Sequence, residues 1–170
     1  GHTINTNALT AAFGSAMVGA SVIEYAVDDG TGELPVLPWL ATAPAYTNAG
    51  EYIIWYRVTN PNYEDFVHAA KLSITKRPVT VAVAGHTATF AYDTTEKTVS
   101  GYDVATEDAL YDIAANTVFS GAALASRTDV GTTAMGLSAA NFANNNENFE
   151  MTYLVTDGWL KIEPRIIGDD

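Results

Sequence analysis

Residues 50–59 read Gly-Glu-Tyr-Ile-Ile-Trp-Tyr-Arg-Val-Thr, the longest run of aromatic and β-branched residues around which the strand pattern is built. Residues of these kinds favour β-strands. Because strand side chains alternate between two faces, one face takes the four residues Tyr52, Ile54, Tyr56 and Val58. We expect that face to be core, whereas Trp55 falls on the opposite face. The Asn60-Pro61-Asn62 sequence then ends the strand.

The motifs around this strand occur twice, in the same order. The first copy comprises Thr47-Asn48-Ala49-Gly50, Asn60-Pro61-Asn62-Tyr63 and Ile74-Thr75-Lys76-Arg77-Pro78-Val79. The second comprises Thr128-Asp129-Val130-Gly131, Asn146-Glu147-Asn148-Phe149 and Ile162-Glu163-Pro164-Arg165-Ile166-Ile167. The glycine-to-isoleucine interval is 24 in the first copy (74 − 50) and 31 in the second (162 − 131). A kept order with different loop lengths indicates one module used twice.

The repeat predicts an all-β chain of two tandem Ig-like antiparallel β-sandwich modules. The chain has 170 residues, and we place the modules at residues 1–77 and 78–170. Each is somewhat shorter than the roughly 100 residues of an immunoglobulin-like sandwich. A short junction containing a proline, Lys76-Arg77-Pro78, predicts a semi-rigid joint and a rod of two modules.

Alternating apolar patterns predict the remaining elements. Strands are expected at residues 21–27, 71–75, 79–83, 87–91, 97–104, 117–122, 132–137, 151–156 and 159–163, with a weaker first strand from residues 4–20. Asp157-Gly158 predicts a two-residue hairpin between the last two strands. Short helical turns are expected within residues 106–115 and 138–143, and no long amphipathic helix is expected.

Charge and composition exclude several classes of partner. The formal net charge is −12, with 20 acidic and 8 basic residues, so the chain repels phosphate backbones and is not expected to bind nucleic acid. No apolar run approaches the ~20 residues of a membrane helix, so no membrane insertion is expected from this fragment. The chain has no cysteine. Gly1 resembles a remnant of tag removal, and we expect the sequence to come from inside a longer protein.

Catalytic, metal and cofactor chemistry are not predicted. The three histidines, His2, His68 and His86, belong to no Ser/His/Asp or metal-ligand spacing, and we expect them to be solvated. The acidic residues Asp28, Asp29 and Glu33, and a second group of Asp103, Glu107, Asp108 and Asp112, offer oxygen ligands for calcium. No D-x-D-x-D-G loop is present, so solvated loops are the favoured interpretation.

A covalent crosslink is a further alternative. Lysine and asparagine in neighbouring strands can form an isopeptide bond, and Lys97 with Asn141 or Asn144 fits that residue requirement. A lysine at the start of a strand is more often an exposed edge charge. We therefore favour the exposed lysine.

Trp55 and Trp159 are the candidate binding residues, because both fall opposite the predicted core faces. Exposed aromatic side chains form protein-binding or glycan-stacking sites. The alternative is that neighbouring strands cover them.

Two stretches carry a family resemblance: residues 90–102, Phe-Ala-Tyr-Asp-Thr-Thr-Glu-Lys-Thr-Val-Ser-Gly-Tyr, and residues 155–164, Val-Thr-Asp-Gly-Trp-Leu-Lys-Ile-Glu-Pro. With the Thr-Asx-x-Gly strings, they resemble the tandem Ig-like repeats, of MBG and YDG type, of large bacterial surface proteins. The resemblance covers most of residues 79–165, and residues 46–78 of the first module. Thr94 stands where the family has glycine, which predicts a turn that avoids positive φ, and Trp159 replaces a small polar residue.

The resemblance implies stalks on Gram-positive cells, and hence a location at the bacterial cell surface or cell wall. The expected function is that of non-catalytic spacer modules that project a distal adhesive or functional domain, with neighbouring repeats as partners. Its fold-determining residues would be Gly50, Gly131, Tyr52, Tyr56, Tyr63 and Phe149. The alternative function is an adhesin module that contacts a host glycan or protein through its exposed aromatics. Whether Ile166-Ile167 begins a third module stays open.

Overall fold

The computed structural model describes residues 1–13, 18–34 and 38–168. Strands make up 51% of the chain and helices are few, which confirms the all-β prediction. The chain divides into two compact units, Gly1–Lys76 (unit 1) and Arg77–Asp170 (unit 2). The predicted boundary lies one residue later, between residues 77 and 78.

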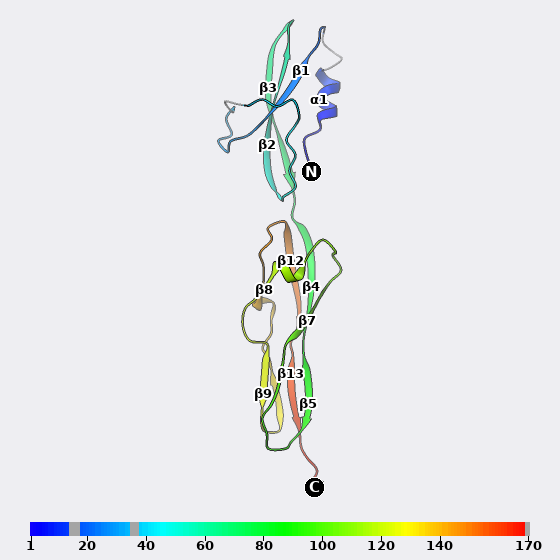
Figure 1. The fold of residues 1–170 in the computed structure, drawn as a ribbon, viewed down its shortest axis with the longest axis vertical. Coiled ribbons are helices and arrows are strands. Elements are labelled where there is room, and N and C mark those ends of the chain that lie inside the picture. Colours follow the sequence, from blue (N-terminus) through cyan, green and yellow to red (C-terminus); the bar gives the residue numbers. More distant parts are fainter. Residues whose placement is uncertain (14–17, 35–37, 169–170) are drawn as a thin grey trace. The chain divides into compact units, whose positions relative to one another are not determined.

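Unit 1 is built on one antiparallel sheet of β1 (Val22–Val27), β2 (Gly50–Asn60) and β3 (Tyr63–Ile74), in that order (Figure 1). The predicted core face of the central strand is confirmed, because Ile54, Tyr56 and Val58 are buried. β3 begins well before the predicted residue 71 and reaches back to the Asn60-Pro61-Asn62 turn. The sequence also assigns Pro35, Pro38 and Pro44 to a loop and short edge strand after residue 27, and of these Pro35 lies outside the described residues.

The first element of unit 1 is a helix, so the strand predicted from residues 4–20 is wrong. Helix α1 spans Thr6–Phe13. The Asn5 side chain accepts a hydrogen bond from the backbone N–H of Ala8 at 3.0 Å, which satisfies a helix-start donor in the manner of an N-cap. Leu9 and Phe13 of the helix pack on the core of the sheet, and the Phe13 ring lies 5.3 Å from that of Phe66.

A parallel two-strand ladder runs through unit 2. The first strands of the unit are β4 (Arg77–Gly85) and β5 (Thr87–Ala91), and the last are β12 (Phe149–Thr156) and β13 (Trp159–Glu163). β12 pairs with β4 and β13 with β5, both in parallel. The register offset is the same at the two ends (149 − 77 = 72 and 163 − 91 = 72). The expectation of wholly antiparallel sheets is therefore wrong for this unit.

The predicted Asp157-Gly158 hairpin is also wrong. The strands on either side of these residues do not pair with each other, and each pairs in parallel with the first strands of the unit. The Asp157 carboxylate instead accepts the backbone N–H groups of Gly136 and Leu137, at 3.0 and 2.8 Å. The aspartate therefore anchors a neighbouring segment at a break in one long strand.

Shorter elements complete unit 2. β7 (Tyr102–Thr106) pairs with β4, β10 (Gly131–Ala134) with β13, β6 (Lys97–Ser100) with β9 (Leu124–Arg127), and β8 (Thr117–Phe119) with β11 (Phe142–Asn144), all antiparallel. The two helical turns are α2 (Ile113–Asn116) and η1 (Ala139–Asn141), inside or at the edge of the segments predicted for them. Figure 1 shows β4 and β12 side by side in one half of this unit, and β5 and β13 in the other.

The parallel ladder is interrupted at Gly85-His86 in one strand and at Asp157-Gly158 in the other, and we call this interruption the break. The residues that face the core are odd-numbered before the break and even-numbered after it. Before the break the buried or half-buried residues are odd-numbered: Val79, Val81 and Val83 with Tyr153 and Val155. After it, the fully buried residues of β13 are even-numbered, Leu160 and Ile162. Because strand side chains alternate strictly, this change requires an irregular step at the break. One ladder thereby serves two hydrophobic cores.

Glycines make the break possible. A Cβ atom on Gly158 would lie 2.5 Å from both the carbonyl oxygen of His86 and the Sδ of Met135. A Cβ on Gly85 would collide with the backbone nitrogen of Gly158. The two paired strands approach too closely at this point for any larger residue.

The sequence repeat corresponds to a structural repeat. Gly50 lies opposite Ile74 in unit 1, and Gly131 lies opposite Ile162 in unit 2, both across antiparallel pairs. The two Asn motifs form the same turn. In unit 1 the N–H of Asn62 donates to the Oδ1 of Asn60 at 2.9 Å, and in unit 2 the N–H of Asn148 donates to the Oδ1 of Asn146 at 3.1 Å. The matched motifs therefore hold matched positions in the two units.

The turn at residues 93–95 has a left-handed residue. Thr94 has φ of 67°, so the prediction that this turn avoids positive φ is wrong. Asp93 holds the turn by accepting the N–H and the hydroxyl of Thr95, at 3.0 and 2.6 Å. The Lys97 ammonium, which donates to the Asp93 carboxylate at 2.6 Å, and then the two Thr95 contacts hold the pKa of Asp93 far below its usual range. Unit 1 contains the same turn with glycine in the middle: Asp29 binds Thr31 at the same two distances, and Gly30 has φ of 87°.

Thr94→Gly is expected to stabilise unit 2 by about 1 kcal/mol, because a β-branched residue is strained in the left-handed region and glycine is not. Part of the gain is offset by the greater freedom of glycine in the unfolded chain. Chemical denaturation of the full chain measures the change. Thr98→Gly, on the exposed side of β6, is the matched control and should destabilise. Loss of stability in Thr94→Gly would contradict the strain argument.

Candidate functional site

Trp55 lies on the face of β2 opposite the buried row, as its alternation predicts. It is half-buried, between Ala26 of β1 and Ala69 of β3 in the register of the sheet. Its indole N–H donates to the Asp28 carboxylate at 2.9 Å. The polar atom of the indole is thus satisfied within the unit, and the rest of the ring remains partly accessible.

A second tryptophan on the same face was not predicted. The Arg57 guanidinium lies 4.7 Å from the ring centre of Trp39, a cation–π distance, and also pairs with Glu24 at 2.6 Å. The alternation of side chains along β2 places Arg57 on the same face as Trp55, whereas Trp39 lies in a loop outside the sheet. No local pattern around Trp39 predicts that contact, because residues 39 and 57 are brought together only by the fold.

Trp159 belongs to unit 2. It starts β13, lies between Ala134 of β10 and Thr87 of β5, and has 37% of its surface exposed. Trp55 and Trp159 are therefore placed in different units, and neither unit brings the two together. The face that carries Trp159 also carries the Lys161–Glu163 ion pair at 2.7 Å.

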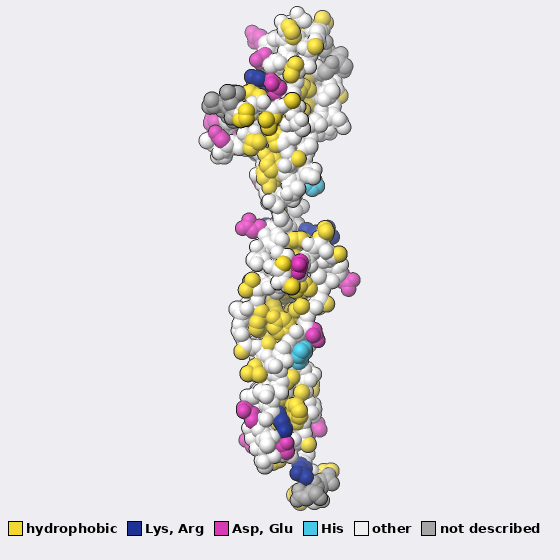
Figure 2. All heavy atoms as spheres, viewed as in Figure 1, with side chains coloured by type: hydrophobic (Ala, Val, Ile, Leu, Met, Phe, Trp, Pro, Cys, Tyr) yellow, Lys and Arg dark blue, Asp and Glu magenta, His cyan; other side chains and the backbone are white. Residues whose placement is uncertain are grey.

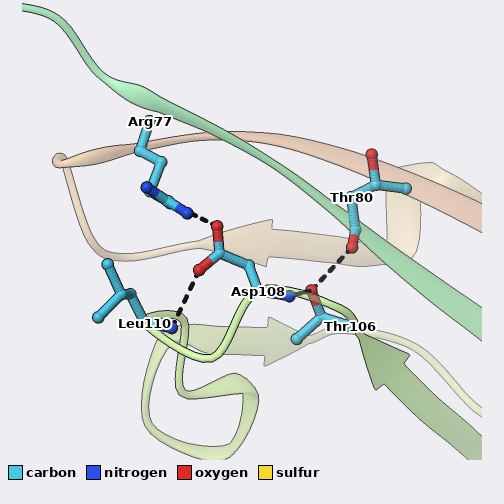
Figure 3. Close-up of polar contacts among 5 residues, drawn as sticks. All are labelled: Arg77, Thr80, Thr106, Asp108 and Leu110. Atoms are coloured by element: carbon cyan, nitrogen blue, oxygen red, sulfur yellow. Dashed lines mark hydrogen bonds and ion pairs between the residues drawn. The ribbon is translucent and has the colours of Figure 1, made fainter.

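A groove of about 440 Å³ lies on the outer side of β4 and β7. Its floor consists of small residues, and at one end Arg77 donates to Asp108 at 2.5 Å. Asp108 also accepts the N–H of Leu110 at 2.9 Å, and its own N–H donates to Thr106 (Figure 3). The Arg77 guanidinium holds the pKa of the Asp108 carboxyl below its usual value. This network fixes the loop after β7, and it contains no nucleophile hydrogen-bonded to a base.

The acidic groups of the sequence are dispersed among separate partners. Asp112 caps α2 by accepting the N–H of Ala115 at 3.1 Å, Asp108 binds Arg77, and Asp103 faces His86. On the face drawn in Figure 2, Asp and Glu side chains are scattered over both units. Within the described residues, no group of three or more His, Cys, Asp or Glu side chains could hold a metal ion.

The histidines occupy three different settings. The backbone of His2 forms a bridge with Tyr46, and His68 is exposed in the middle of β3. His86, at the break in the ladder, donates from Nδ1 to the Ser100 carbonyl oxygen at 2.8 Å, and its Nε2 lies 3.4 Å from Asp103. The Ser100 carbonyl and then the Asp103 carboxylate raise the pKa of His86 above its ordinary value.

The raised pKa of His86 predicts a pH dependence. A raised folded-state pKa stabilises unit 2 fully below the ordinary histidine pKa of about 6.5, and the contribution is lost as the pH rises through the folded value. In Asp103→Asn the pKa of His86 should fall, while the Ser100 carbonyl keeps part of the effect. An NMR titration of the His86 ring measures both. An equal His86 pKa in the two proteins would show that Asp103 does not raise the pKa of His86.

The lysine considered for a crosslink is engaged elsewhere. The Lys97 ammonium donates to Asp93 and to Thr95, at 2.6 and 2.8 Å, and lies 5.8 Å from the Phe90 ring centre. Asn141 binds the backbone of Ser120, and Asn144 accepts a hydrogen bond from the Tyr111 hydroxyl. The three side chains have separate partners, so the geometry gives the isopeptide bond no support.

No protein-family model, curated protein or solved structure matches this chain. Among the described residues, no helix is both long and apolar enough to cross a membrane. The geometry defines the molecule as a β-rich chain of two units, with partly exposed tryptophans in each and a parallel ladder in the second.

Proposed function

We propose that this chain is a non-catalytic structural segment of a large bacterial surface protein. Its Ig-like repeats would space and project a distal adhesive or functional domain, outside the cell at the surface or wall. The observation that carries the proposal is the parallel ladder of unit 2, in which the first strands of the unit pair with the last.

The parallel ladder is oriented so that unit 2 can resist tension applied along the chain. The chain enters unit 2 at Arg77, at one end of the ladder, and leaves after Glu163, at the other end. Tension between these points pulls the paired strands past each other along their axes. The hydrogen bonds of the ladder then share the load, whereas a pull that separates the strands at one end breaks them one after another.

Unit 1 has a different arrangement. His2 near its start bridges Tyr46, whose ring stacks on Tyr52 at 3.9 Å, and Ile74 at the end of β3 lies opposite Gly50. The first and last described parts of unit 1 therefore lie toward the same end of the β2–β3 pair. Tension across this unit would peel β3 away from that end.

Single-molecule pulling on the full chain tests the proposal. The chain has no cysteine, so attachment points can be added as cysteines at will. Attachments at Lys76 and Glu163 load unit 2, and attachments at Gly1 and Lys76 load unit 1. Unit 2 should unfold at clearly higher force, because forced unfolding follows the barrier along the pulling direction. A unit 2 that yields at or below the force of unit 1 would count against a tension-bearing spacer.

The alternative function is a ligand-binding adhesin module that contacts a host glycan or protein. The observation in its favour is the face of unit 1 where Trp39 is stacked by Arg57 and Trp55 is oriented by Asp28. Partly exposed aromatics beside charged groups are common in recognition sites. Binding of the full chain to a glycan array, abolished in a Trp39→Ala/Trp55→Ala double variant and kept in Trp159→Ala, would favour this function over the spacer.

A further inference from the structure

β3 of unit 1 has one unpaired edge. Its twelve residues, Tyr63–Ile74, pair with β2 along one side. Within the described ranges of the chain, no other segment forms a strand pairing or a backbone-to-backbone hydrogen bond with it, although the Tyr63 hydroxyl accepts the N–H of Val18 at 3.4 Å. Tyr63 and Phe66 remain 46% and 41% exposed. An open edge of this length is a template for another strand.

The corresponding edge of unit 2 is filled. The repeat matches Ile74 to Ile162 and Gly50 to Gly131, and in both units the glycine strand pairs with one side of the isoleucine strand. On the other side of Ile162, β13 pairs in parallel with β5, and its continuation β12 pairs with β4. The edge that is open in β3 is therefore the edge that residues 77–91 occupy in unit 2.

We propose that β3 binds an extended strand of a second polypeptide, which runs parallel to it and joins the sheet β1-β2-β3. In this mode the main chain supplies hydrogen bonds, and alternate side chains supply specificity. The stretch from Phe66 to Ala70 carries no proline and no acidic, lysine or arginine residue, so nothing in it blocks such a ladder.

The residue types expected in the partner strand can be inferred from residues 77–91, which occupy the corresponding edge in unit 2. Residues 79–83 alternate valines that face the core with Thr80 and Ala82, which face outward. In the parallel register Arg77 lies opposite Phe149, which the repeat matches to Tyr63. The next residues of β3 are Glu64 and Asp65, both exposed. The partner strand should therefore have a basic residue at its N-terminal end, followed by alternating β-branched residues.

A synthetic peptide with the sequence of residues 77–91 and blocked ends is the probe, added to the isotope-labelled full chain. Hydrogen exchange read by NMR should slow at those β3 amides that do not bond to β2. A spin label at the peptide N-terminus should broaden signals near Tyr63 and leave those near Ile74 unchanged. The same peptide, N-methylated at alternate residues, should not bind, because it cannot form the ladder.

Charge reversal gives a variant that leaves the backbone intact. Glu64→Lys/Asp65→Lys should weaken peptide binding about fivefold, because the peptide arginine loses an exposed ion pair and is repelled by the new lysines. Three results would overturn the proposal: no protection of β3 at saturating peptide, broadening near Ile74 instead of Tyr63, or protection confined to unit 2. Self-association of the peptide-free chain through β3 would also overturn it, since the occupant would then be a second copy.

Discussion

Gly158→Ala should destabilise unit 2 by at least ~3 kcal/mol, a large part of the stability of a domain of this size. The new methyl group would lie 2.5 Å from the His86 carbonyl oxygen and from the Met135 sulfur, and 2.9 Å from the backbone carbon of Gly85. Backbone atoms on the paired strand cannot move aside without breaking the ladder. Hydrogen exchange resolved along the full chain reports the loss in unit 2 separately from unit 1.

Gly136→Ala is the matched control for this prediction. Nothing lies within 4 Å of a Cβ at Gly136, although its φ of 81° makes alanine strained. That strain alone should cost roughly 1–2 kcal/mol. If Gly158→Ala costs no more than Gly136→Ala, the close approach of the two strands is not what requires glycine at the break.

The second large effect concerns two leucines on the same pair of consecutive strands. Leu160 is fully buried in the second core of unit 2, whereas Leu154 is 59% exposed. Leu160→Ala should cost about 2–5 kcal/mol, the range for leucine truncation in a packed core. Leu154→Ala should cost under about 0.5 kcal/mol, because it removes little buried surface and opens no cavity.

The leucine pair tests the irregular step in the ladder. Residues 154 and 160 are six apart, so an unbroken strand would place both on one face. Denaturant unfolding of the two variants measures their costs under one set of conditions. Equal costs would mean that the core does not change sides at Asp157 and Gly158.

Local patterns predicted the strands and their faces well. The bounds of β5 and β13 are those predicted, and the core face of β2 is confirmed by the burial of Ile54, Tyr56 and Val58. The direction of pairing was missed because alternation is the same in parallel and antiparallel strands. The pairing between residues 77–91 and 149–163 joins segments 72 positions apart, and Asp157-Gly158 carries a hairpin signal that a distant contact overrides.

The candidate site was predicted less completely. Alternation placed Trp55 and Trp159 opposite the core, and the predicted boundary placed them in separate modules, but neither pattern could show which residues lie beside each ring. The contact of Arg57 with Trp39 depends on the path of a loop, which has no period to read. At Thr94, the glycine expected from the sequence resemblance was the better guide to the backbone conformation, and the Asp93 contacts allow threonine to adopt positive φ.

The parallel ladder should make unit 2 resistant to tension, and a comparison of two pulling geometries measures that resistance. Pulling between cysteines introduced at Lys76 and Glu163 shears the ladder from its two ends. Pulling between Lys76 and Glu147, which lie at the same end because Arg77 pairs with Phe149, unzips the same ladder. We expect a much higher unfolding force for the first pair of attachments than for the second. Equal forces, or a higher force for the second pair, would contradict it.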